Sequence, residues 1–151
     1  APLKKRQSRQ VSSTAPKFYL FDVGVAGALT HRHLTQERGE MFGRALEHFI
    51  FMEIRAHRSL SELNYAMHFW RTKSGLEADF VLGDGEVAIE VKGANRGGRS
   101  ELRPLAAFRD EYRPRQTLVV CNERIERIHE RIRILPWRVF LRDLWAGKII
   151  G

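Results

Sequence analysis

The chain has 151 residues, of which 43% are hydrophobic and 29% are charged. This balance excludes a disordered chain and is typical of one globular domain with its own core. Twenty-six lysines and arginines against 18 aspartates and glutamates give a net charge of +8, which favours an anionic partner, nucleic acid above all. The single cysteine, Cys121, excludes an intrachain disulfide and a cysteine-based zinc site, and it fits a reducing cytoplasm.

The first 16 residues are polar and basic, with Lys4, Lys5 and Arg6 standing together. We expect a linker from an upstream region here, followed by one domain over residues 17–151. The absence of an initial Met predicts a fragment or a processed product. The three basic side chains are alternatively candidates for contacts with nucleic-acid phosphates. The sequence contains no signal peptide and no apolar run long enough to span a bilayer, so we expect a cytoplasmic protein without a membrane partner.

Residues 17–22 form an apolar run that predicts a strand, and the small residues at 23–29 predict a short helix. Residues 40–59 predict the strongest helix, and apolar side chains occur nearly all round it. We therefore expect this helix to be buried on more than one side. Glu47 stands among these apolar side chains. A carboxylate in such surroundings is costly without a partner, which is either a metal ion or an arginine from elsewhere.

Residues 69–93 predict a strand, a turn and then an antiparallel hairpin. Alternation over 76–82 and 87–92 gives each strand of the hairpin one apolar face. The short turn between these two strands is typical of a hairpin connection. The other face of the hairpin displays charged groups, which are Asp79, Glu90 and Lys92.

This charged face has two interpretations. In the first, the face binds a metal ion, since Mg²⁺ and Mn²⁺ prefer oxygen ligands. One or two protein carboxylates, with water and substrate phosphate, are sufficient to bind Mg²⁺. Asp79 and Glu90 provide two carboxylates. A neighbouring ammonium such as that of Lys92 can orient an attacking water and stabilise phosphate charge. Alternatively, the face is solvated, and Glu90 and Lys92 form an ordinary pair on it.

The loop at 93–98 is rich in glycine, and Arg96 and Arg99 beside it either contact phosphates or flank a simple chain reversal. The other predicted elements are a helix at 100–112, a buried strand at 117–121, a solvated segment at 122–130, a strand at 131–135 and a helix at 137–146. The loop and helix after the third strand permit a parallel crossover. We therefore predict an α/β fold with a mixed central sheet and helices on both sides.

This order of elements resembles the PD-(D/E)XK nuclease superfamily, whose signature is a helix Glu, a strand Asp and a Glu-x-Lys strand. The matching residues are Glu47, Asp79, Glu90 and Lys92. More closely, the chain resembles the DUF4143 domain through KFYLFD with a glycine two residues later, a Gly-x-x-x-Glu helix, FWRTKSGLEADF and IEVKG. That domain usually forms the C-terminal part of a prokaryotic P-loop AAA-type ATPase. No P-loop motif occurs in this sequence, so the ATPase would be an upstream region of the same polypeptide.

The resemblance implies a restriction-endonuclease-like fold with an αβββαβ core and a Mg²⁺- or Mn²⁺-dependent phosphodiesterase that acts on DNA. It further implies that Asp79, Glu90, the Val91 carbonyl and Glu47 hold the metal, and that Lys92 positions the hydrolytic water. Glu77 and Lys73 are expected near enough to assist. The residues expected to contact nucleic acid are Lys73, Arg96, Arg99, Lys4, Lys5 and Arg6. The alternative is an inactive nuclease-fold module that binds DNA or a partner protein and regulates the ATPase.

Overall fold

The structure is a computed structural model that describes residues 39–93 and 99–151, apart from the side chains of residues 99–101. The predicted basic linker, the strand at 17–22 and the helix at 23–29 lie outside the described residues. No helix in the described ranges has the length and apolar character needed to cross a bilayer. The elements in chain order are α2 (Gly39–Leu60), β1 (Met67–Arg71), β2 (Glu77–Leu82), β3 (Val87–Lys92), α3 (Arg99–Tyr112), β4 (Gln116–Cys121), β5 (Arg127–His129), β6 (Ile132–Pro136) and α4 (Trp137–Trp145).

Six strands form one mixed sheet in the order β1-β2-β3-β4-β6-β5. β1, β2 and β3 pair antiparallel, whereas β3 pairs parallel with β4 and β4 pairs parallel with β6. The predicted crossover is therefore confirmed, since the connection through α3 joins two parallel neighbours. The predicted hairpin turn is also present, and Gly83 and Gly85 in it have φ of 66° and 81°, values that glycine adopts without steric cost.

The segment at 122–130 differs from its expected form. We predicted a solvated segment, but Arg127–His129 forms β5, which pairs antiparallel with β6 at the edge of the sheet. Ile128 on this strand is 69% exposed, so the segment lacks the apolar alternation that marks a half-buried strand. Its strand conformation depends on pairing with β6, which the local sequence does not reveal.

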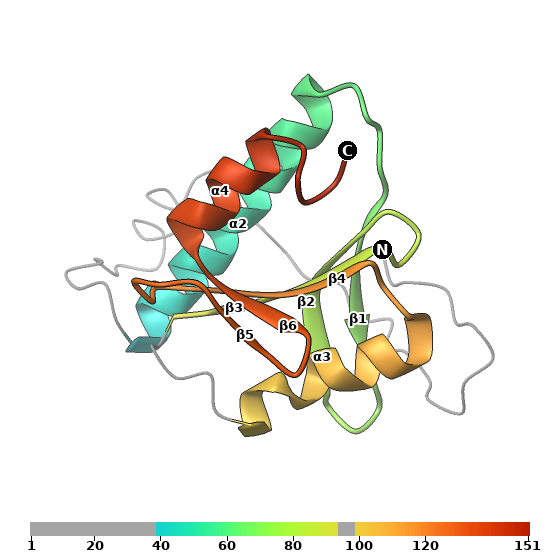
Figure 1. The fold of residues 1–151 in the computed structure, drawn as a ribbon, viewed down its shortest axis with the longest axis vertical. Helices are drawn as coiled ribbons and strands as arrows, with labels where there is room; N and C mark the ends of the chain where they lie inside the picture. The colour runs from blue at the N-terminus through green and yellow to red at the C-terminus, as the bar shows by residue number, and fades with distance from the viewer. Residues whose placement is uncertain (1–38, 94–98) are drawn as a thin grey trace.

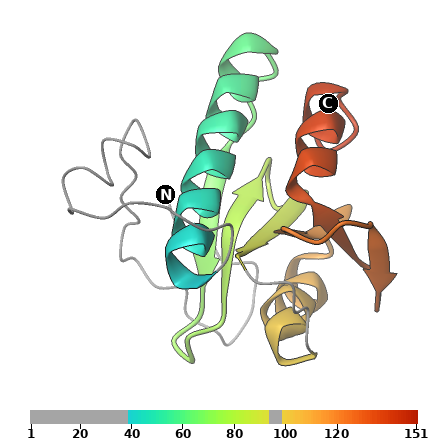
Figure 2. The ribbon, with the colours of Figure 1, turned by 90° about the vertical axis from the view of Figure 1, so that its left-hand side faces the viewer.

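Helices cover both faces of the sheet and give the domain three layers (Figure 1; Figure 2). α2 and α4 lie on one face, and α3 lies on the other. The core beneath α2 includes Ile50, Ile89 and Val91. The core beneath α3 includes Trp70 and Phe108, whose rings meet edge to face with 5.4 Å between their centroids. The predicted mixed sheet with helices on both sides is thus confirmed.

A close contact between two glycines sets the position of α2 over the sheet. A methyl group added to Gly93, directly after β3, would lie 2.4 Å from Cα of Gly43 in α2 and 2.5 Å from its backbone nitrogen. A side chain at this position would overlap the helix backbone, so glycine lets α2 approach the carboxyl end of β3. The buried stripe that follows along α2 has one apolar residue per turn and consists of Phe42, Leu46, Ile50 and Ile54.

Candidate functional site

Asp79 lies on β2 at the point where the ladder between β2 and β3 ends. The last paired residues of the two strands are Phe80 and Ile89. Beyond this pair, Oδ2 of Asp79 accepts the backbone N–H of Val91 at 2.8 Å. Asp79 is buried, with 5% of its surface exposed, so this bond forms away from bulk water. The carboxylate therefore holds β3 beside β2 where the paired ladder stops.

Glu90 and Lys92 form a close ion pair at the carboxyl end of β3. Nζ of Lys92 lies 2.6 Å from Oε1 of Glu90, and the side chain of Glu90 is 4% exposed whereas that of Lys92 is 34% exposed. The second carboxylate oxygen of Glu90, Oε2, is buried and has no hydrogen-bond partner in the described part of the chain. A buried polar atom without a partner is costly. This oxygen therefore has bonding capacity that the described residues leave unused.

The pKa of Glu90 depends on its burial and on the charges of Asp79, Lys92 and Glu77. Burial raises the pKa of Glu90 to about 8, and the negative charge of Asp79 acts in the same direction. The charge of Lys92 and its hydrogen bond lower this pKa, while Glu77 raises it further. A nearby negative charge disfavours the ionised form of a carboxyl group, whereas a nearby positive charge favours it. An added cation would therefore favour the ionised form of Glu90.

The two carboxylates of the hairpin are buried and do not lie on a solvated surface. Val91 packs into the core beneath α2, and Ala88 and Val81 pack into the core beneath α3. Since successive side chains of a strand alternate between faces, Glu90 leaves β3 on the α3 side with Ala88. β2 has a register shift between its pairs with His68 and Trp70 of β1, so alternation does not by itself assign Asp79 to a face. The hairpin thus holds Asp79 and Glu90 as a buried pair, with 5% and 3% of their surfaces exposed.

Glu47 stands on the helix that covers the other face of the sheet. It follows Gly43 by one turn in α2 and is half-buried. Within the described ranges, no group of three or more His, Cys, Asp or Glu side chains lies close enough to hold a metal ion. The structure therefore brings Glu90 and Lys92 together and holds Asp79 against the backbone of Val91, while the expected part of Glu47 in this site stays a prediction.

The residues expected to contact nucleic acid are only partly described. Lys73 is exposed in the turn between β1 and β2, next to the Thr72 hydroxyl, which accepts the N–H of Leu76 at 3.0 Å. Arg99 is the first residue of α3, but its side chain is not described. The other expected contact residues, Lys4, Lys5, Arg6 and Arg96, lie outside the described residues.

The described residues define a three-layer α/β domain with a buried acidic pair and a lysine at the carboxyl end of a central strand. Residues 42–140 match the family model described as "Domain of unknown function (DUF4143)", and the chain belongs to this family. No curated protein and no solved structure matches the chain. The family expected from the sequence motifs is therefore confirmed.

Proposed function

We propose that this domain is a Mg²⁺-dependent phosphodiesterase that acts on DNA and uses a PD-(D/E)XK-type site. The observation that supports this proposal best is the buried carboxylate of Glu90, which lies beside Lys92 and within electrostatic reach of Asp79. The net charge of +8 favours a polyanionic substrate. In the same proposal the domain serves a P-loop AAA-type ATPase region of the same polypeptide, and Mn²⁺ can replace Mg²⁺ because both prefer octahedral oxygen ligands.

The donor groups fit a cation held by two carboxylates and water. Oε2 of Glu90 is buried without a hydrogen-bond partner in the described part of the chain, and Mg²⁺ usually needs only one or two protein carboxylates. Asp79 and Glu90 would supply these two groups, and the Val91 carbonyl would be a further oxygen. Glu47 would complete the shell directly or through water.

The chain's own residues would have separate tasks in hydrolysis. The bound ion would lower the pKa of a coordinated water and offset charge on the phosphate. Lys92 would orient that water, since its side chain reaches solvent at 34% exposure while its ammonium stays on Glu90. Asp79 would keep its orientation through the bond from the Val91 N–H. Burial of Glu90 would strengthen each of these charge interactions by excluding water.

A second candidate is a nuclease-fold module that binds DNA or a partner protein without cutting it. The ion pair of 2.6 Å between Lys92 and Glu90 favours this candidate, because it gives both side chains a structural role without a metal. The lack of a three-carboxylate cluster in the described ranges points the same way. In this case the charged residues would stabilise the strand ends, and the domain would report DNA or partner binding to the ATPase region.

Plasmid nicking in Mg²⁺ or Mn²⁺ tests the first candidate. We expect wild type to convert supercoiled plasmid to nicked circles, and Asp79→Asn and Lys92→Gln to slow this by about 100-fold. The matched controls are Asp84→Asn and Lys148→Gln, which remove the same charges at exposed positions away from the site. Equal nicking by all five proteins, as a contaminating nuclease would produce, contradicts the proposal.

Titration calorimetry with Mn²⁺ separates the two candidates. A phosphodiesterase of this type has one Mn²⁺ site in wild type that is lost in Asp79→Asn and Glu90→Gln. The module that does not cut binds DNA without any Mn²⁺ site that depends on these two residues. A variant that still binds DNA but no longer nicks plasmid has a defect in the chemical step and not in substrate binding.

A further inference from the structure

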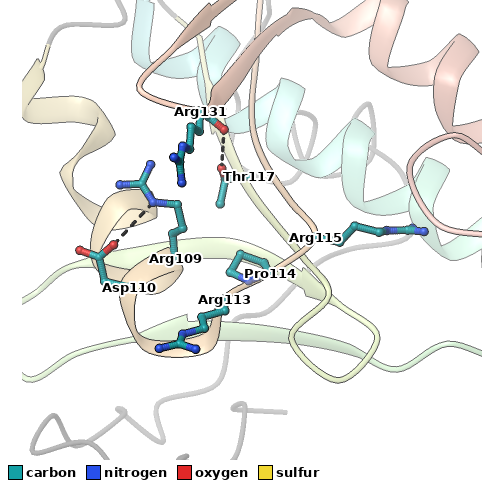
Figure 3. A pocket seen from close by; sticks show the side chains of 7 residues that line it. All are labelled: Arg109, Asp110, Arg113, Pro114, Arg115, Thr117 and Arg131. Atoms are coloured by element: carbon teal, nitrogen blue, oxygen red, sulfur yellow. Dashed lines mark hydrogen bonds and ion pairs between the residues drawn. The ribbon is translucent and has the colours of Figure 1, made fainter.

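An arginine-rich cavity lies at the C-terminal end of α3 (Figure 3). Its volume is about 550 Å³, which is within the range of about 300–1,000 Å³ typical of small-molecule sites. Residues at the C-terminal end of α3, at the start of β4 and in the turn between β5 and β6 line it. We call it the arginine pocket, and the polar residues that define it are Arg109, Asp110, Arg113, Arg115, Thr117 and Arg131.

Positive charge in the arginine pocket is largely uncompensated. Four arginines line it against one acidic residue, Asp110, whose Oδ1 lies 3.5 Å from Nε of Arg109. In the part of the chain that the structure describes, no carboxylate lies within ion-pair distance of Arg113, Arg115 or Arg131. Arg115 points away from the others in Figure 3 and donates to the Ile149 carbonyl at 2.9 Å.

Two arginines from different elements converge on the same space. The side chains of Arg109 in α3 and Arg131 in the β5–β6 turn point toward one another. Like charges that face each other without an anion between them repel. The C-terminal end of a helix favours a cation such as Arg109, but this effect gives no reason for Arg131 to face it from another element. A bound anion would offset the charge of both.

Backbone contacts hold both arginines in this arrangement. Arg109 donates from Nη1 to the carbonyl of Glu130, and the Thr117 hydroxyl donates to the carbonyl of Arg131 at 3.2 Å. Glu130 and Arg131 form the two-residue turn with φ of 48° and 67°. Such a turn usually carries Asn or Gly, because residues with larger side chains rarely adopt positive φ. An arginine placed at a strained position points to a role for its side chain.

We propose that the arginine pocket binds the phosphate group of a nucleotide, either free or within a nucleic-acid strand. A guanidinium presents a planar fork of donors that matches phosphate oxygens, and two such forks can share one phosphate. The volume of the cavity accommodates a phosphate with its sugar and base. This site is separate from the acidic pair, because the two lie at opposite ends of the parallel strands β3 and β4. The arginine pocket lies at the end where Val87 pairs with Gln116, and Glu90 lies near the end where Lys92 pairs with Cys121.

The proposal does not depend on the phosphodiesterase proposal. α3 has 14 residues, so its ends lie about 20 Å apart at a rise of 1.5 Å per residue. The acidic pair lies toward the C-terminal end of β3, before the chain enters α3. The arginine pocket lies at the C-terminal end of α3, before the chain enters β4. Phosphate binding here could therefore occur in either a cutting or a non-cutting domain.

Binding measurements in EDTA test the arginine pocket without any metal-dependent chemistry. The probes are a short fluorescein-labelled single-stranded DNA, followed by anisotropy, and ATP, followed by calorimetry. We expect Arg109→Gln/Arg131→Gln to weaken binding about tenfold or more, since hydrogen bonds to charged groups contribute this much. Arg55→Gln, which removes an exposed arginine from α2, is the matched control and should change affinity less than twofold.

Each outcome of these measurements is informative. Binding of ATP that the double variant loses supports a free nucleotide as ligand, whereas loss confined to the oligonucleotide supports a strand. Equal affinity of wild type and the double variant for both probes overturns the proposal, as does failure of wild type to bind either probe. Arg131→Gln alone changes an exposed turn residue and replaces the double variant if circular dichroism shows that the latter is unfolded.

Discussion

The carboxylate of Asp79 provides a bonding partner for the backbone of Val91, whose N–H it accepts at 2.8 Å. The two strands that carry these residues end their paired ladder at Phe80 and Ile89. A side chain thus continues the contact between β2 and β3 past the paired residues. This arrangement lets β2 and β3 present Asp79 and Glu90 side by side, and it gives Asp79 a structural role whatever its chemical role.

Removal of the Asp79 carboxylate should destabilise the domain. We expect Asp79→Ala to lower the free energy of unfolding by about 1–3 kcal/mol, because the buried N–H of Val91 loses its acceptor. Asp79→Asn should cost less, since its amide oxygen can still accept that bond. Urea denaturation followed by tryptophan fluorescence gives both values. Asp84→Ala, at an exposed position in the hairpin turn, is the control, and equal midpoints for Asp79→Ala and wild type would refute a structural role for this bond.

The raised pKa of Glu90 predicts that stability depends on pH. Burial, with help from Asp79, raises this pKa from its ordinary value of 4.5 to about 8. Between these values the folded protein retains a proton that the unfolded chain has released, so the free energy of unfolding falls as pH rises. One proton gives a slope of at most ~1.4 kcal/mol per pH unit.

Denaturation series from pH 5 to about pH 8 measure this dependence. Glu90→Gln should flatten the curve, because its side chain does not titrate, whereas Glu62→Gln at an exposed position should leave the slope unchanged. Added Mg²⁺ or Mn²⁺ should reduce the fall in stability if a cation binds ionised Glu90. A Glu90→Gln curve as steep as that of wild type would show that another group titrates.

The contact between Gly43 and Gly93 predicts opposite effects for two similar substitutions. In Gly93→Ala the new methyl group would lie 2.4 Å from Cα of Gly43, and we expect a loss of about 1–3 kcal/mol as α2 is displaced. In Gly43→Ala the methyl group would lie 3.4 Å from the nitrogen of Gly93, an ordinary contact. Alanine also has a higher helix propensity, so this change should be neutral or stabilise by up to ~1 kcal/mol.

Thermal or urea unfolding of both glycine variants provides the comparison. Gly75→Ala is a useful third protein, because Gly75 has φ of 86° but nothing within 4 Å of an added methyl group. It therefore reports the cost of backbone strain without a steric overlap. If Gly93→Ala destabilised no more than Gly43→Ala, the close approach of α2 to β3 would not control stability.

Local patterns in the sequence were sufficient for most of the elements. The helix predicted at 40–59 is α2 (Gly39–Leu60), and the strand predicted at 87–92 is β3 (Val87–Lys92). The predicted buried strand at 117–121 is β4, and Cys121 is a core residue with 1% exposure. Helical stripes, strand alternation and glycine turns are properties of neighbouring residues, so they are visible before any folding. The edge strand β5 has no such local pattern, because its exposed side chains carry no burial signal.

The candidate site could be predicted only in part, because local patterns do not report how distant elements pack. Asp79, Glu90 and Lys92 share one hairpin, so strand alternation alone places them on one face. The relation of Glu47 to that face depends on which side of the sheet α2 packs, and no local pattern decides this. The prediction that Glu47 joins the other carboxylates in a metal site therefore stays a prediction, with α2 on the face opposite to Glu90.

By itself, the sequence determined the family, the mixed α/β character and the hairpin that carries the acidic pair. Only the tertiary structure decided that this pair is buried, so that Glu90 has a raised pKa. It also brought together Arg109 and Arg131, which are more than 20 positions apart in the chain and belong to different elements. The physical reason is that burial and convergence depend on how helices and strands pack across long sequence separations. The spacing of apolar residues along the chain indicates only which face of each element is apolar.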